Sequence, residues 1–164
     1  MIKFTELHPE NAKRLSDLAK PIWQEHYTPI IGAKQVSYML DKFQSESAIL
    51  QQLTQGYRYF EVYSSEKLMG YFSVQLRDSN SFFISKFYLA NHARGKKLGS
   101  AMLEHIKQLA LKAGCKHLDL TVNKYNPAYQ IYLKLGFVNI GSVEFDIGGG
   151  YIMDDYLMRK ELNG

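Results

Sequence analysis

Residues 87–106, FYLANHARGKKLGSAMLEHI, begin as an apolar strand and end as a helix with an apolar stripe. The turn between these two elements, RGKKLG at residues 94–99, holds two glycines and three cations, although a bend alone would need one glycine. A helix start offers backbone N–H groups that have no partner within the helix, and the helix dipole adds positive charge there. The turn is therefore either an anion-binding site or a tight turn whose lysines lie in solvent.

The helix after this turn is the longest clear helix of the sequence. Leu98, Met102 and Ile106 recur every four residues, which predicts one buried face of a helix over about residues 97–113. Before the turn, SFFISKFYLA at residues 81–90 is apolar on both faces apart from two polar positions, which is typical of a central strand.

Further strands and helices are predicted on both sides of this strand–turn–helix unit. Apolar alternation and turn signals indicate strands at residues 2–7, 57–65, 67–78, 116–122, 137–147 and 151–162. Helical patterns occur at residues 10–27, 33–43 and 46–53 and between Asn126 and Gly136. We expect the first helix to be interrupted near Pro21, because proline lacks the amide that the helix needs. The order of elements predicts a single α+β (mixed α/β) domain over residues 1–164, with a central, mostly antiparallel sheet flanked by helices.

The composition is that of an ordinary globular protein, with 46% hydrophobic and 22% charged residues. No apolar run approaches the roughly 18 residues of a membrane span, and the N-terminal residues do not resemble a secretory signal, so we expect a cytoplasmic protein without a membrane partner. The single cysteine excludes an internal disulfide framework, and the scattered histidines predict no metal site. The net charge of +4 comes without a long basic block, so nucleic acid is not the expected partner.

Two motifs occur in order along the chain: RGKKLGSAML at residues 94–103 and NPAYQIYLKLGF at residues 126–137. Together they resemble the two signatures of the GNAT superfamily of acyl-CoA-dependent N-acetyltransferases. Arg94 and Gly99 match the ends of the family's turn motif. The second signature is matched by Tyr132, Lys134, Gly136 and Phe137. The resemblance implies the GNAT fold, with a sheet of about seven strands.

The sequence departs from the family pattern at two places. Lys97 stands where the family usually has its middle glycine, so its side chain must point away from the ligand or bring its ammonium onto a phosphate. Asn126 lies six residues before Tyr132, one fewer than the usual spacing, so the entry into the last helix must differ slightly.

The resemblance implies that an acetyl group moves from acetyl-CoA to a primary amine by direct attack, without a metal. The pyrophosphate would bind to backbone amides of residues 94–100, and the pantetheine arm would pair like an added strand with residues 87–89. A backbone N–H near Leu89 would stabilise the oxyanion. The residues assigned in this way to acetyl-CoA are Phe87, Tyr88, Leu89, Arg94, Gly95, Lys96, Lys97, Leu98, Gly99, Ser100, Asn126 and Lys134.

Tyr132 is the candidate general acid, because a phenol can give its proton to the departing CoA thiolate. Its alternative role is packing, since Tyr129, Tyr132 and Leu133 are expected on one helical face. The general base stays open. The strand at residues 81–90 holds Lys86 and no carboxylate, which leaves a water chain, Glu25, His26 or a residue of the closing strands.

The acceptor amine is expected to meet the segments around residues 22–32 and 146–156. Glu25 and His26 lie beside aromatic residues, and Asp154 and Asp155 would attract a second positive charge or simply form a solvated hairpin end. These segments resemble the bacterial polyamine or diamine acetyltransferase branch of the superfamily. Protein N-termini and aminoglycosides are the other acceptors considered.

Two functions other than catalysis are also consistent with the sequence, and a homodimer is the expected assembly. A sensor that binds acetyl-CoA with little catalysis would explain Lys97 and the missing strand carboxylate, and the basic turn could bind nucleic acid with a strong dependence on salt. The closing strands are apolar enough to pair across a homodimer.

Overall fold

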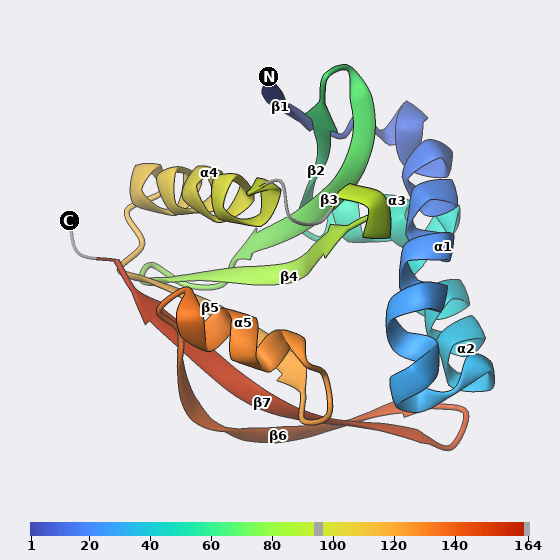
Figure 1. Ribbon diagram of the computed structural model, residues 1–164. Helices are drawn as coiled ribbons and strands as arrows, with labels where there is room; N and C mark the ends of the chain where they lie inside the picture. Colours follow the sequence, from blue (N-terminus) through green and yellow to red (C-terminus); the bar gives the residue numbers. More distant parts are fainter. Residues whose placement is uncertain (94–96, 163–164) are drawn as a thin grey trace.

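The structure, a computed structural model, describes residues 1–93 and 97–162. The described residues form a seven-stranded sheet with the order β1-β2-β3-β4-β5-β7-β6 (Figure 1). Among the strand pairs of the described residues, only β4–β5 is parallel, which confirms the expected mostly antiparallel sheet. The strands are β1 (Ile2–Glu6), β2 (Arg58–Ser64), β3 (Lys67–Leu76), β4 (Ser81–Leu89), β5 (His117–Asn123), β6 (Val138–Gly148) and β7 (Tyr151–Glu161).

Helices cover both faces of this sheet (Figure 1). The helices are α1 (Ala12–Ile31), α2 (Ala33–Gln44), α3 (Glu46–Thr54), α4 (Leu98–Lys112) and α5 (Ala128–Lys134), with short 3-10 turns at Pro9–Asn11 and Asn91–Ala93. Because side chains alternate along a strand, Tyr59 and Tyr71 pack toward α1–α3 while their neighbours Phe60 and Phe72 pack toward α4. The sheet therefore separates two cores.

The first helix differs from the prediction, because α1 continues through Pro21 and Pro29. Proline at position 21 removes one backbone hydrogen bond, and the buried side chains on both sides of it, including Ala19 and Ile22, hold the helix against the sheet. The prediction of an interruption was wrong because tertiary packing outweighs one missing bond. Within the described ranges, neither α1 nor any other helix is long and apolar enough to cross a membrane.

A buried chain of hydrogen bonds connects the three N-terminal helices to the sheet. Trp23 Nε1 on α1 donates to the Tyr71 hydroxyl at 2.8 Å, and this hydroxyl donates to Gln44 Oε1 at 2.5 Å. Gln44 Nε2 in turn donates to the Tyr59 hydroxyl at 2.9 Å. Because buried polar groups are costly without partners, this chain sets the position of α1 and α2 on β2 and β3.

The tip of the β6–β7 hairpin packs against α2 (Figure 1). The Tyr38 hydroxyl donates to the Ile147 carbonyl at 2.7 Å, and the Lys42 ammonium donates to the same oxygen. A Cβ on Gly148 would lie 2.6 Å from the Tyr38 hydroxyl, and one on Gly149 would lie 2.8 Å from its ring. The glycine turn thus allows the hairpin to lie directly on a helix from the other end of the chain.

The outer strand β6 is exposed along most of its length. It forms one edge of the sheet, and its side chains in contact with water include Val138, Ile140 and Phe145. The expected pairing of closing strands across a homodimer stays a prediction.

We expect Gly149→Ala to destabilise the protein more than Gly150→Ala. Both residues have left-handed backbones, with φ of +62° and +82°, which costs a non-glycine residue about 1–2 kcal/mol. Only Gly149 also faces the Tyr38 ring, so its substitution should cost a further ~1–3 kcal/mol of overpacking. Chemical denaturation followed by circular dichroism measures both costs, and equal losses would contradict the contact with Tyr38.

Candidate functional site

The strands β4 and β5 separate after a short parallel pairing. The pairing spans Ser81–Ile84 on β4 and His117–Leu120 on β5. Beyond it, β4 continues to Leu89 and β5 to Asn123. The β4 backbone after Ile84 therefore has β3 on one side and no strand of the described chain on the other, so this edge can accept an added strand.

A bulge on β4 lies where the separation begins. Ser73 of β3 pairs with Lys86, whereas the next residue, Val74, pairs with Ile84, so Ser85 is an extra residue on β4. A bulge of this kind bends a strand and increases its local twist. The bend accompanies the divergence of β4 from β5.

The bulge at Ser85 also shifts the alternation of β4 side chains between the two cores. Before it, Phe82 and Ile84 face α4, and after it Phe87 packs against the same core. Tyr88 then packs with Trp23 in the core under α1. The residues on both sides of Ser85 line a cavity next to the diverging strands.

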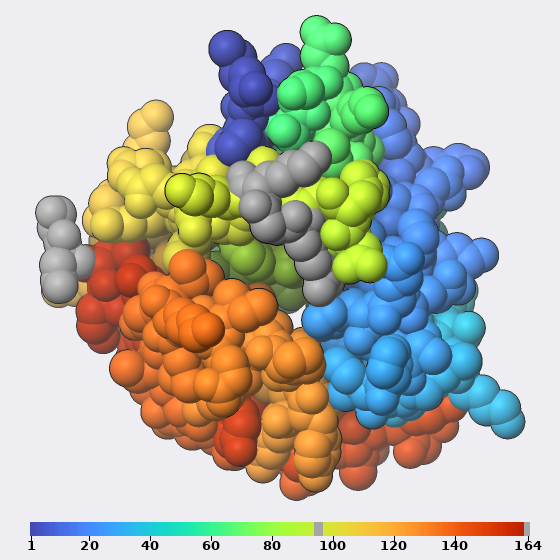
Figure 2. Space-filling model, viewed as in Figure 1, coloured from blue at the N-terminus to red at the C-terminus, as the bar shows by residue number. Residues whose placement is uncertain are grey.

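The cavity next to β4 and β5 has a volume of about 890 Å³. Its walls come from β4, β5, α1, α2, α5, the start of α4 and the β6–β7 hairpin. Figure 2 shows the surface hollowed between α5 and α1. A cavity of this size suits a small-molecule ligand.

The start of α4 borders the cavity with the features of an anion site. Lys97 adopts a left-handed backbone, with φ 58° and ψ 19°, at the position where glycine was expected. The Lys97 side chain is exposed, and a Cβ on Gly99 would meet open space. Leu98 anchors this end of the helix because its side chain is buried. The predicted contacts Arg94, Gly95 and Lys96 lie outside the described residues.

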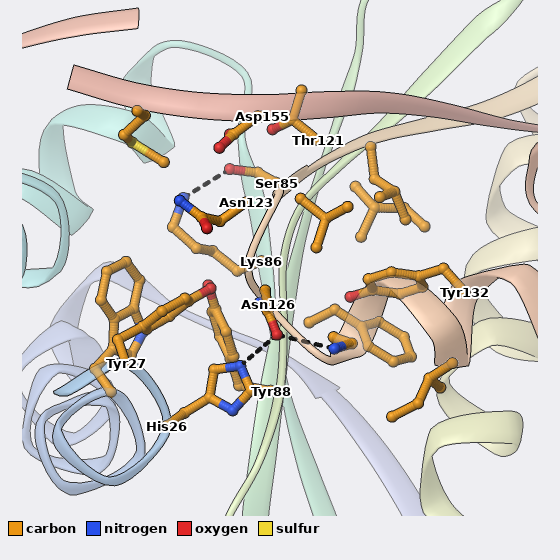
Figure 3. Close-up of a pocket in the computed structure, with 18 of the residues that line it drawn as sticks. His26, Tyr27, Ser85, Lys86, Tyr88, Thr121, Asn123, Asn126, Tyr132 and Asp155 are labelled. Carbon is orange, nitrogen blue, oxygen red and sulfur yellow. Dashed lines mark hydrogen bonds between the residues drawn. The ribbon is translucent and has the colours of Figure 1, made fainter. Parts of the chain in front are cut away.

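Tyr132 lines the cavity from α5 (Figure 3). Its ring lies edge-on to Phe87 and Phe137, with centroid distances of 6.1 and 5.7 Å. Burial raises the pKa of the Tyr132 phenol well above its usual range. The phenol therefore keeps its proton at neutral pH. Tyr129 packs as expected, whereas Leu133 is exposed and does not share this buried face.

Aromatic side chains of α1 and β4 form the wall opposite Tyr132. The Tyr27 and Tyr88 hydroxyls are 2.8 Å apart, and burial raises the pKa of Tyr27 to about 12. Beside them, Asn126 Oδ1 lies 3.1 Å from His26 Nε2 and accepts a hydrogen bond from the Ala128 N–H at 2.9 Å (Figure 3). Asn126 therefore joins α1 to the first turn of α5.

Asp155 is the buried carboxylate of the cavity. Its exposed fraction is 1%, and its Oδ1 has no hydrogen-bond partner among the described residues. Burial, together with the charge of Asp154, raises the pKa of Asp155 to about 6, although a hydrogen bond with Thr121 opposes the shift. This carboxylate can take up and release a proton near neutral pH.

The structure brings most of the sequence-predicted site residues to one cavity. Those that line it are His26, Phe87, Tyr88, Leu89, Lys97, Leu98, Gly99, Ser100, Asn126, Tyr132 and Asp155. Glu25, Lys134 and Asp154 do not line it. Asp154 instead pairs with Lys124 at 2.9 Å near the surface.

Sequence reasoning missed Thr121, and it noted Lys86 only as an interruption of an apolar strand that holds no carboxylate. Lys86 lines the cavity, and that interruption was the signal available for it. Gly70 was also missed: a Cβ there would overlap the Tyr88 carbonyl oxygen, so this glycine lets β3 approach β4 closely beside the cavity. Among the residues that the structure describes, no group of three or more His, Cys, Asp or Glu residues could hold a metal ion.

Comparisons with known proteins give one family and several related folds. A family model described as an acetyltransferase (GNAT) domain matches residues 27–151. No curated protein sequence matches the chain significantly.

Among solved structures, a PaiA N-acetyltransferase from Thermoplasma acidophilum in complex with coenzyme A is 19% identical, with a TM-score of 0.82 over 98% of this chain and 99% of that chain. A GCN5-related N-acetyltransferase from Rhodopseudomonas palustris is 17% identical, with a TM-score of 0.82 over 98% and 95% of the two chains. The ribosomal-protein-S18-alanine N-acetyltransferase from Escherichia coli is 18% identical, with a TM-score of 0.71 over 100% and 96%. At sequence identities this low, the similarity to these structures is evidence for a shared fold only.

We expect Lys97→Gly to stabilise the protein by about 1 kcal/mol. Glycine removes the left-handed strain of about 1–2 kcal/mol, and part of this gain is offset by the greater entropy of the unfolded chain. The melting temperature should rise by ~2–4 °C. Lys97→Ala is the matched control, because it removes the ammonium and keeps the strain. A gain in Lys97→Ala as large as in Lys97→Gly would show that the side chain, and not the backbone, is responsible.

We expect Asp155→Asn to stabilise the protein at pH 8 and to leave its stability unchanged near pH 3. The pKa of Asp155 is raised from 3.8 to about 6 in the folded state, so ionisation costs stability as the pH rises through this range. The gain at pH 8 should be about 1–3 kcal/mol, measured by denaturant unfolding at both pH values. Asp41→Asn, at an exposed carboxylate of α2, should show no such gain. A less stable Asp155→Asn at pH 8 would mean that the ionised carboxylate supports the fold.

Proposed function

The chain belongs to the acetyltransferase (GNAT) domain family, and from this premise we propose that it transfers an acetyl group from acetyl-CoA to a small primary amine. The observation that carries the proposal is the open edge of β4 next to the start of α4 and within one cavity with Tyr132 and Asp155. We also take residues 1–164 as one acetyltransferase domain, because the sheet includes strands from both ends of the chain, β1 and β7.

The residues present fit acetyl-CoA. The free edge of β4 at Phe87–Leu89 offers backbone groups to the amide-rich pantetheine arm, and a backbone N–H near Leu89 would stabilise the negative charge of the reacting carbonyl oxygen. The first amides of α4 have no partners within the helix, and the space beside Gly99 leaves them accessible to the pyrophosphate. Acetyl-CoA supplies the thioester, and all other groups of the reaction come from this chain and the amine.

Asp155 is the proposed general base. An ammonium must lose a proton before its nitrogen can attack, and a carboxylate with a pKa of about 6 is ionised at neutral pH and can accept that proton. The other candidates fit less well: Glu25 does not line the cavity, and His26 is engaged with Asn126. Tyr132 is the proposed general acid, because its phenol faces the same cavity in its protonated form.

A diamine or polyamine is the acceptor that the sequence suggested. The aromatic wall of Trp23, Tyr27 and Tyr88 supports it, because aromatic faces attract cations, and Asp155 supplies a negative charge. The second carboxylate on which that suggestion relied, Asp154, is paired with Lys124 outside the cavity. We therefore keep the primary amine as the proposed class and treat the polyamine as one member to be tested.

A turnover screen tests the proposed function. Release of CoA from acetyl-CoA is followed with polyamines, aminoglycosides and short peptides as acceptors. Turnover with any primary amine supports the enzyme. Binding of acetyl-CoA without turnover on all of them would support the sensor instead.

We expect Tyr132→Phe to lower turnover at least tenfold, within the ~10²–10⁴ that a positioned proton donor usually contributes. The variant removes the hydroxyl and keeps the ring that packs on Phe87. Tyr129→Phe is the matched control, because it removes a hydroxyl from the same helix outside the cavity lining. An unchanged rate in Tyr132→Phe would remove Tyr132 from the mechanism.

A further inference from the structure

Lys86 is a cation that has no balancing anion among the residues that the structure describes. Its Nζ donates to the Ser85 hydroxyl at 2.8 Å, and within the described chain no carboxylate lies at ion-pairing distance from it. Burial, with a smaller effect of the Arg77 charge, lowers the pKa of Lys86 to about 8. A partly buried charge of this kind costs stability, which is a common feature of binding and catalytic sites.

Lys86 also lies where two cavities adjoin. A second cavity of about 310 Å³ is formed mainly by α2, α3 and the segment before β2. Four residues line both this cavity and the larger one, namely Lys42, Phe43, Ser85 and Lys86. A ligand in the large cavity can therefore contact the same side chains that border the small one.

The smaller cavity favours an anion. Two of its lining residues are lysines, Lys42 and Lys86, and no aspartate or glutamate is present among the described residues that line it. Its other polar residues are Ser85, Tyr57 and three glutamines, which can donate hydrogen bonds. The Lys42 ammonium already contacts the Ile147 carbonyl, so it is held at this position.

The large cavity carries the opposite charge, because Asp146 of β6 and Asp155 of β7 line it. Asp155 of β7 faces it with an unpaired Oδ1, and no ion pair joins Asp155 to Lys86 in the described structure. Figure 3 draws Asp155, Thr121, Ser85 and Lys86 in the same part of the view. The site thus presents a positive and a negative group that do not neutralise each other.

We propose that the acceptor is an amine that also carries an anionic group, a carboxylate or a phosphate, which binds to Lys86 and Lys42 where the two cavities adjoin while the amine faces Asp155 and Tyr132. This inference rests on the proposed acetyl transfer and narrows its substrate class. Each end of such a ligand supplies the charge that its protein partner lacks. A diamine would instead bring its second ammonium toward Lys86, and like charges in a cavity of low polarity repel.

Matched acceptors test the proposal on the unaltered protein. Pentylamine, cadaverine, aminovalerate and aminopentyl phosphate share one chain length and differ in their terminal group. We expect kcat/KM for at least one anionic acceptor to exceed that for pentylamine at least tenfold, with cadaverine below pentylamine; the better of the two anionic acceptors identifies the group that is recognised. A higher kcat/KM for cadaverine than for the anionic acceptors, or equal kcat/KM values for all four acceptors, would overturn the inference. Either result would leave the proposed acetyl transfer in place.

Calorimetry separates this inference from the proposed function. Binding of the same four compounds is measured on protein saturated with CoA, so the order of affinities does not depend on turnover. Tighter binding of an anionic amine supports the subsite even if no acetyl transfer occurs. Affinities that do not distinguish the terminal groups overturn it.

Substitution of Lys86 tests the residue itself. Lys86→Gln should lower kcat/KM for the preferred anionic acceptor at least tenfold more than it lowers kcat/KM for pentylamine, whereas Lys86→Arg should retain most of the preference for the anionic acceptor. Lys34→Gln, an exposed lysine of the same helix as Lys42 and outside both cavities, should change neither. An equal loss for both acceptors in Lys86→Gln, with the melting temperature unchanged, would show that Lys86 does not distinguish the terminal groups and would contradict the proposal.

Discussion

The loss of pairing between β4 and β5 after Ile84 and Leu120 is the constraint on which the rest of the molecule depends. A strand interior normally satisfies its N–H and C=O groups on both sides, and a buried group without a partner is costly. From Ser85 onward, one side of β4 must therefore meet water or a ligand. The bulge at Ser85 bends the strand at this point, and Gly70 allows β3 to stay close to it. The divergence thus creates a cavity while β4 stays joined to the sheet.

The walls of the cavity are held by contacts between distant parts of the chain. The hydrogen bonds from Trp23 through Tyr71 to Gln44 fix α1 and α2 on the sheet, which places Tyr27 opposite β4. The hairpin tip closes another side because Tyr38 of α2 holds the Ile147 carbonyl. Because interiors are close-packed, a change in one of these contacts alters the shape of the cavity, so packing and specificity are linked here.

The buried charges of the cavity lower the stability of the protein, and the fold alone does not require them. Burial works against the ionised forms of both Asp155 and Lys86, as their shifted pKa values show. The buried Glu61, by contrast, is bonded through both oxygens to Arg14, at 2.7 and 2.8 Å. This contrast between a neutralised ion pair and two groups left unneutralised favours a role in binding for Asp155 and Lys86.

The sequence by itself determined most elements and their order, because periodicity and capping act over a few residues. The apolar stripe from Leu98 predicted α4, and Ser45 caps α3 as expected, its hydroxyl accepting from the Ala48 N–H at 3.2 Å. Only the tertiary structure decided that α1 continues through Pro21 and that Asp155 and not Asp154 faces the cavity. It also decided that Lys86 lies there with no carboxylate partner in the described part of the chain. The physical reason is that register, burial and charge compensation depend on partners from other strands and helices, which a local pattern does not specify.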